Sequence, residues 1–222
     1  MTLKKKITKV KTIYALGFNS LRRVLLYRLG VKFGFNSVKK LKADINSGDF
    51  FMAPENIANI DLTVNNSWEN RHFYFGWKEN KTKNIPNWHE NILTGMLVNQ
   101  PELNWWEISD FDSSLGDIKG VWEASRFDWV ICFAQKAAQG DLLALEKLNL
   151  WLNDWCDKNP PYKGVNWKCG QEASIRIMHV AIAALILKQH EKLSPSLSTF
   201  IKAHLLRILP TIHYAVGQDN NH

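Results

Sequence analysis

The chain has 222 residues, of which 45% are hydrophobic and 22% are charged. These proportions exclude a disordered chain, a collagen-like chain and a small disulfide scaffold, and no apolar run reaches the roughly 18 to 20 residues that span a bilayer. The net charge of +7 is uneven, because the first 50 residues hold 12 of the 28 basic residues and two of the 21 acidic ones. The remainder is slightly acidic, so we expect no nucleic acid as a partner.

The first predicted element is a basic helical segment over residues 1–35. Apolar residues from Leu21 to Leu29 recur at helical spacing, with three arginines among them. Two interpretations stay open: a helix packed on the body by this stripe, or an amphipathic helix in which residues 1–30 make peripheral contact with an anionic membrane. The lysine-rich start lacks the apolar run and cleavage site of a secretory signal, so the sequence leaves the location unknown, periplasmic or cytoplasmic.

Residues 36–104 form the second predicted region, which is rich in asparagine and irregular. A short strand-like run at Arg71–Phe75 is followed by Gly76, a pattern that favours a small hairpin. We expect this region to be an extended segment wrapped on the domain.

Residues 105–222 form the third region, in which the apolar pattern becomes helical. The expected helices run from about Val121 to Gln139, Leu142 to Lys158, Gln171 to Gln189, and Leu197 to Val216. Glycine, aspartate and proline between them are typical helix caps and breakers. Short polar loops between long helices favour antiparallel helical hairpins, so the sequence predicts a mainly α fold. Periodicity alone does not separate a bundle from a toroid.

Two segments combine aromatic and charged residues at predicted helix starts. In the first, Trp122 precedes Glu123 and Arg126, which are i,i+3 neighbours that can pair. In one interpretation Trp122 stacks on a sugar ring while the pair binds hydroxyls or a carboxylate. In the other, Trp122 belongs to the core and the pair is a surface salt bridge.

The second segment places Trp167 in a glycine-punctuated loop, followed by Glu172 and Arg176 at i,i+4. The planar fork of arginine suits a substrate carboxylate, and the alternative is an ion pair within the helix. Three widely spaced cysteines and scattered histidines form no metal-binding pattern, and the chain has no phosphate-binding loop. The sequence therefore predicts no metal and no cofactor.

Taken in order, these segments resemble the heparinase II/III-like polysaccharide lyases, and more narrowly members found in bacterial surface-polysaccharide gene clusters. The resemblance is strongest over residues 105–222. The basic segment Leu21–Arg28 also resembles the N-terminus of these proteins. Its motifs are Asp117-Ile118-Lys119, Trp122-Glu123 with Arg126-Phe127, Asn159-Pro160, Gly164 with Asn166-Trp167, Glu172 with Arg176, and Asn220-Asn221-His222.

This resemblance implies an N-terminal (α/α) toroid, a following β-sandwich, and β-elimination at a uronic acid of an acidic polysaccharide. A lyase must neutralise the substrate carboxylate and place a base at C5 and an acid at O4. By resemblance, Asn221 would hydrogen-bond the uronate carboxylate and His222 would be the base or assist it. The residues expected to bind substrate, by shaping the cleft or supporting its wall, are Trp122, Glu123, Arg126, Trp167, Glu172 and Arg176.

The family's catalytic tyrosine and β-sandwich come after its Asn-Asn-His motif, whereas this sequence ends at His222. We therefore expect an incomplete toroid that is weakly active alone and self-associates through exposed helix faces. One alternative is a non-catalytic glycan-binding or assembly protein that uses aromatic stacking platforms, since ten tryptophans exceed the needs of the core. Another is a peripheral membrane adaptor.

Overall fold

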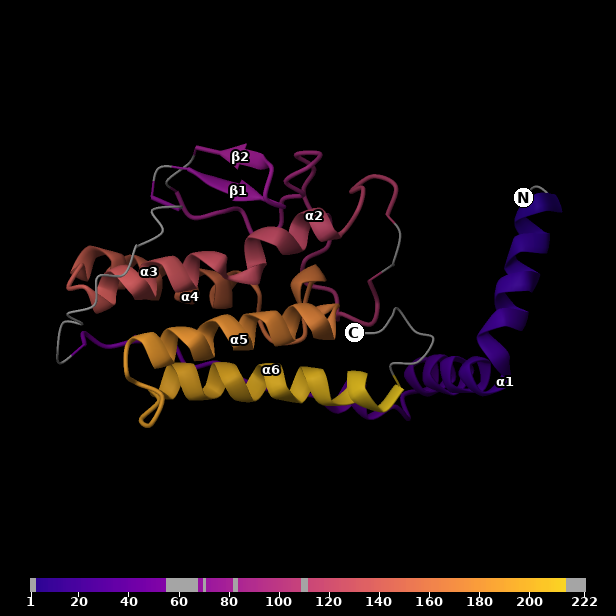
Figure 1. Cartoon of the computed structure of the whole chain (residues 1–222). Coiled ribbons are helices and arrows are strands. Elements are labelled where there is room, and N and C mark those ends of the chain that lie inside the picture. Colours follow the sequence, from indigo (N-terminus) through magenta and orange to yellow (C-terminus); the bar gives the residue numbers. More distant parts are fainter. Residues whose placement is uncertain (1–2, 55–67, 70, 82–83, 109–111, 215–222) are drawn as a thin grey trace.

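The computed structural model describes residues 3–54, 68–69, 71–81, 84–108 and 112–214, with the side chains of 3–14, 16 and 210–214 left out. The described chain is mainly helical, as the sequence predicts (Figure 1). Its helices are α1 (Leu3–Phe33), α2 (Lys119–Trp122), α3 (Asp128–Ala138), α4 (Leu142–Lys158), α5 (Gly170–Ile186) and α6 (Pro195–Tyr214). Short 3-10 turns are η1 (Ser37–Lys40), η2 (Glu123–Arg126) and η3 (Val165–Trp167), and β1 (His72–Tyr74) pairs antiparallel with β2 (Lys78–Asn80).

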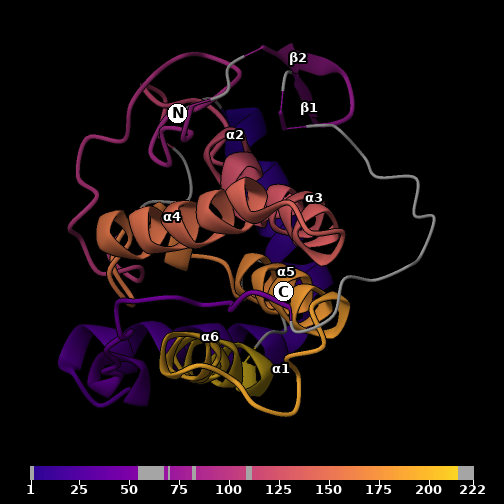
Figure 2. The same cartoon turned by 90° about the vertical axis from the view of Figure 1, so that its left-hand side faces the viewer.

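Two helical hairpins make up the body of the molecule. Helices α3 and α4 pack together, α3 also packs on α5, and α5 packs on α6. Figure 2 shows the hairpins as layers, with the β1–β2 hairpin on the far side of α3 from α6. The predicted antiparallel arrangement and the predicted small hairpin are therefore confirmed.

The ends of the later helices follow from their capping residues. The Asp141 side chain accepts a hydrogen bond from the Ala144 amide at 3.0 Å, which caps α4. The helix then ends before Pro160, so both predicted ends of α4 are confirmed. Helix α6 starts at Pro195, a position where the fixed φ of proline suits the first turn.

The single helix predicted from Val121 to Gln139 is wrong, because the chain breaks at Phe127. This residue has φ 72°, and it separates η2 from α3. A left-handed residue costs roughly 1 to 2 kcal/mol. Burial of the Phe127 ring against Trp129, Trp155 and Phe200 offsets that cost. The break ends η2 at Arg126, where this residue contacts α5.

Most of the tryptophans belong to the core, so the predicted surplus is also wrong. The buried ones are Trp68, Trp88, Trp105, Trp122, Trp129, Trp151, Trp155 and Trp167. Trp88, Trp129 and Trp151 contact one another at ring-centroid distances of 5.3 to 6.3 Å. Trp77, beside the hairpin turn, is 67% exposed.

An extended segment before residue 55 is held by amide side chains of α4 and of the loop after α5. Asn149 on α4 accepts from the backbone amides of Phe50 and Phe51 at 3.0 Å and donates back to the Phe51 carbonyl at 2.8 Å. Gln189 makes a matching pair of bonds with the backbone of Met52. The phenylalanine rings are buried, so this strand-like segment covers the core between α4 and α6.

Several helices keep apolar side chains on the surface. On α5, Met178, Ile182 and Leu185 are exposed at helical spacing. No helix in the described ranges has both the length and the apolar content to cross a membrane.

Candidate functional site

A charged cluster joins the end of η2 to the first turn of α5. Arg126 donates through Nε and Nη2 to the two carboxylate oxygens of Glu172, at 2.9 and 2.8 Å. Its Nη1 donates to Glu123 at 2.7 Å. Glu172 is buried and the Arg126 side chain is 27% exposed, so the two-point pairing shields a buried carboxylate.

Glu123 extends this cluster to the β hairpin. Its Oε1 accepts from the backbone amide of Phe75 at 2.6 Å, in the turn that follows β1. Burial raises the pKa of Glu123, while the Phe75 amide and the Arg126 charge act against that rise. One carboxylate therefore fixes the hairpin to η2.

His179 lies two turns beyond Glu172 on α5 and adds a further bond to this charged cluster of Glu123, Arg126 and Glu172, which we call the joint. Its Nδ1 is 2.5 Å from the Arg126 carbonyl oxygen. A carbonyl oxygen can only accept, so this bond requires the tautomer in which Nδ1 carries the proton. Asp128 Oδ1 lies 3.6 Å from the same nitrogen. Both the backbone and the side chain of Arg126 are thus bonded to α5.

Trp122 anchors a loop rather than offering a ring to solvent. The side chain is buried, and its Nε1 donates to the Val165 carbonyl at 2.8 Å. The loop approaches closely because Gly164 has φ 73°, and a Cβ there would lie 2.7 Å from the Pro101 carbonyl oxygen. The glycine of the predicted motif is therefore a steric requirement.

Two asparagines connect this loop to the end of α4. Asn166 donates through Nδ2 to Asn159 Oδ1 at 2.8 Å and to the Trp88 carbonyl at 2.9 Å. Trp167 Nε1 donates to the Asn159 carbonyl at 2.9 Å, and its ring has no exposed surface. The Asn-Pro and Asn-Trp motifs thus form one buried hydrogen-bonded unit.

The ion pair within α5 between Glu172 and Arg176 is wrong, since Glu172 pairs with Arg126 instead. Arg176 is fully buried, donating through Nε to His204 at 3.0 Å and through Nη2 to the Asn166 carbonyl at 2.8 Å. Among the described residues its Nη1 has no partner. Burial lowers the pKa of Arg176 to about 10.

His204 on α6 accepts this bond as a neutral ring. Its Nδ1 lies 2.9 Å from the Phe200 carbonyl and donates to it, which leaves Nε2 as the acceptor for Arg176. Burial and the neighbouring guanidinium both lower the pKa of His204 well below its usual value. The α5–α6 contact therefore depends on an uncharged imidazole.

The predicted site residues thus fall into three groups. Glu123, Arg126 and Glu172 form the joint, which confirms the predicted Glu123–Arg126 pair. The second group is buried and consists of Trp122, Trp167 and Arg176. These side chains are not exposed to a ligand, so they would influence one only by positioning the residues that they contact. Asn221 and His222 lie outside the described residues.

The sequence reasoning missed two buried polar residues of α6. His204 and Arg207 share the buried face of this helix with Phe200 and Ala203. Arg207 donates through Nε to the Trp167 carbonyl at 2.6 Å and its guanidinium stacks 3.7 Å from the Trp105 ring. Both lie at helical spacing from the apolar residues Phe200 and Ala203, and this position on the apolar face is the sequence signal that could have revealed them.

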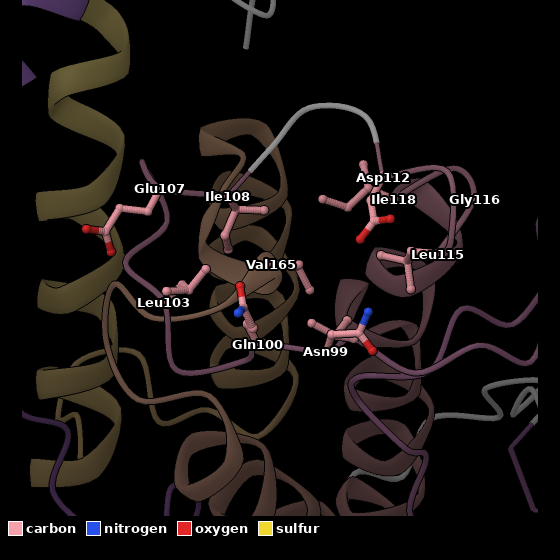
Figure 3. A pocket seen from close by; sticks show the side chains of 11 residues that line it. Asn99, Gln100, Leu103, Glu107, Ile108, Asp112, Leu115, Gly116, Ile118 and Val165 are labelled. Atoms are coloured by element: carbon pink, nitrogen blue, oxygen red, sulfur yellow. The ribbon is translucent and has the colours of Figure 1, made fainter. Parts of the chain in front are cut away.

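A pocket of about 200 Å³ lies on the other side of the Val165 loop (Figure 3). Its acidic side chains already bond within their own loops: Glu107 accepts from Asn104, and Asp112 from Ser114. The lining consists of Val98, Asn99, Gln100, Leu103, Glu107, Ile108, Asp112, Leu115, Gly116, Ile118 and Val165. With two carboxylates and no lysine or arginine in that lining, the pocket does not suit an acidic sugar.

Within the described ranges, no three His, Cys, Asp or Glu side chains are grouped so as to hold a metal ion. Comparisons of the chain with protein-family models, curated proteins and solved structures found no match.

Proposed function

We propose that the chain is the N-terminal helical part of a polysaccharide lyase that cleaves a uronic-acid-containing acidic polysaccharide by β-elimination. In this proposal the two helical hairpins belong to an (α/α) toroid. The observation that carries it is the two-point bond between Arg126 and Glu172, which lie 46 positions apart in the sequence. This bond brings together in space two motifs, Glu123 with Arg126 and Glu172 with Arg176, that the resemblance relates only by their order in the sequence.

The remaining motifs support the same proposal. The Trp122–Val165 bond draws the glycine-punctuated loop to η2, and the Asn159–Trp167 bond draws it to the end of α4. Residues that act on one substrate need a common rigid support, since misplacing a reacting group by about 1 Å can cost roughly 100-fold in rate.

The charges of the joint give it a positioning role in the proposal. With Glu123 and Glu172 both ionised, the single charge of Arg126 leaves the cluster negative, which would repel a uronate. Hydrogen bonding to the substrate carboxylate is therefore assigned to Asn221, and removal of the C5 proton, or assistance to the base that removes it, to His222.

The surface of α5 supports the toroid. Met178, Ile182 and Leu185 form an exposed apolar row on the side of α5 that the described helices leave open. Hairpins of a toroid cover one another's faces, so such a row is what a further hairpin would bury.

The test is an assay for the unsaturated uronate product, followed by its ultraviolet absorbance, with alginate, heparin and chondroitin sulfate as substrates. We expect slow product formation by this chain, abolished in Asn221→Ala and in His222→Ala. Gln218→Ala is the matched control, a polar change in the same segment that should retain the wild-type rate.

A second function is favoured by the exposed aromatic pair Phe73 and Trp77 on the β hairpin. A non-catalytic glycan-binding protein could use these rings for stacking. If no substrate yields product, while polysaccharide binding survives Asn221→Ala and is lost in Trp77→Ala, the lyase proposal is wrong and glycan binding takes its place.

A further inference from the structure

We propose that the part of α1 after Gly17 docks on an anionic lipid membrane. Gly17 has φ 74° and ψ 155°, which interrupts the helix and divides it into two parts. Figure 1 shows α1 at one end of the molecule, with the part before Gly17 turned away from the body. This inference stands apart from the lyase proposal, because it uses none of the same residues.

One side of the docking part is already occupied by the protein. Tyr27 and Val31 pack against the hydrophobic core, and Val24, one turn before Tyr27, is half-buried. Helix α1 also contacts α6. The helix is therefore attached to the body, and its orientation is set.

The opposite side carries large apolar side chains that are exposed to solvent. Phe18 is 80% exposed and Phe33 is 62% exposed. At 3.6 residues per turn, they fall on one side of the helix together with Leu25, Leu26 and Leu29, which are also exposed. An apolar stripe of this size facing water marks an interaction surface.

The charges around the stripe identify its partner. The helix holds no acidic residue, and of its nine lysines and arginines four lie after Gly17, namely Arg22, Arg23, Arg28 and Lys32. Helical geometry places Arg23 at one border of the stripe, Lys32 at the other, and Arg22 within it, and all three are exposed. The long side chain of Arg22 can reach the headgroups while its methylene stem lies along the stripe. An apolar face with basic borders is the pattern that inserts at the headgroup level of anionic bilayers.

Lipid suits this surface better than an acidic polysaccharide. A polysaccharide would satisfy the arginines and lysines but would leave Phe18, Leu25 and Phe33 in water. A bilayer accepts both groups at once, because anionic headgroups lie directly above the acyl chains.

The experiment is co-sedimentation of the full chain with vesicles of phosphatidylcholine alone or mixed with phosphatidylglycerol. We expect binding to the mixed vesicles, at least about tenfold weaker on pure phosphatidylcholine and at high ionic strength. The triple variant Leu25→Gln, Leu29→Gln, Phe33→Gln should lose about tenfold or more in affinity. Arg23→Gln with Arg28→Gln should weaken binding in the same direction.

Matched controls carry the same chemical changes elsewhere. Leu143→Gln alters a leucine of α4 that is 76% exposed, and Lys119→Gln with Lys192→Gln removes two exposed charges. Both should bind as the wild type does. Far-ultraviolet circular dichroism of every variant checks that the helices remain.

The proposal is overturned if wild-type chain does not sediment with mixed vesicles, or if the triple glutamine variant binds as well as wild type. It is also overturned if heparin binds through α1 while vesicles of either composition do not. Lyase activity is measured separately on soluble polysaccharide, so failure of docking and failure of the lyase proposal give different results.

Discussion

Arg126 and Arg176 are held by opposite means, although each follows a glutamate at helical spacing. Arg126 lies at the joint between η2 and α5, partly exposed, and bonds two carboxylates. Arg176 lies in the α5–α6 interface with no exposed surface, and it bonds a neutral imidazole and a backbone carbonyl. Charge pairing holds the first region, whereas packing and neutral acceptors hold the second.

The rings around Arg176 explain how a buried guanidinium is accommodated. The guanidinium carbon Cζ of Arg176 lies 4.9 Å from the centre of the Trp155 ring and 5.7 Å from the centre of the Trp167 ring. Such cation–π contacts favour the charge, whereas desolvation opposes it, and burial is the main cause of the lowered pKa of Arg176. We therefore expect the α5–α6 interface to be the more sensitive region.

The largest effect is expected from Arg176→Ala. This change leaves a cavity between two tryptophans and removes the donors to His204 and Asn166, so unfolding should become easier by about 3 to 5 kcal/mol. Urea titration followed by tryptophan fluorescence measures the change.

Arg176→Met is the matched control for the charge. It fills most of the same space and abolishes the desolvation cost, so its loss should be about 1 to 3 kcal/mol and smaller than that of alanine. If alanine and methionine cost the same, packing is not what holds this region.

Acid should produce the next largest effect, because buried neutral histidines resist protonation. Burial lowers the pKa of His72 from 6.5 to about 4, and His204 is shifted in the same direction. The unfolded chain then binds more protons, so stability present at neutral pH is lost as the pH falls from about 6.5 towards 4. For His72 we expect a loss of at most about 3 kcal/mol, which solvent screening of the ring reduces.

His72→Phe separates this contribution from others. The ring stacks 3.7 Å from Trp68, and neither ring nitrogen has a hydrogen-bond partner in the described part of the chain. Phenylalanine keeps the stacking and cannot be protonated, so the variant should lose less stability in acid. Equal acid sensitivity of wild type and variant would show that His72 is not buried as described.

The joint should respond more weakly. Glu172→Ala leaves the Arg126 fork without its main partner, and we expect a loss of about 2 kcal/mol, reduced by the partial exposure of Arg126. Glu123→Gln keeps an acceptor for the Phe75 amide, so its loss should be about 1 kcal/mol. Thermal unfolding at constant salt compares the two, and a larger loss for Glu123→Gln would reverse the assigned order.

Local features of the fold were predictable from the sequence. Asp141 and Asn159-Pro160 set both ends of α4, since capping and proline act within one turn. Glu123 and Arg126 pair because residues three apart share a helix face.

Features that depend on distant residues were not predictable in the same way. Phe127 breaks a pattern that reads as one helix because its ring packs against Phe200, 73 positions away. Glu172 pairs with Arg126 and not with its helical neighbour Arg176, because the Arg126 guanidinium donates two hydrogen bonds to its carboxylate. The tryptophan count suggested an exposed surface, and only the packed structure shows that it is core.

The smallest expected effect distinguishes the geometry of the joint from its charge. Arg126→Lys keeps the positive charge but replaces the planar fork with one ammonium, which cannot bond both oxygens of Glu172 and Glu123 at once. We expect a loss of about 0.5 kcal/mol. Salt should destabilise this variant more than the wild type, because a lysine pairs through its charge without the fixed geometry of the fork. The same replacement at Arg176 should cost more, since a lysine there would be buried without its two acceptors in reach. Urea titrations of both variants at low and high salt make the comparison. A larger loss at Arg126 than at Arg176 would mean that carboxylate pairing, not the buried packing of α5 on α6, dominates this part of the fold.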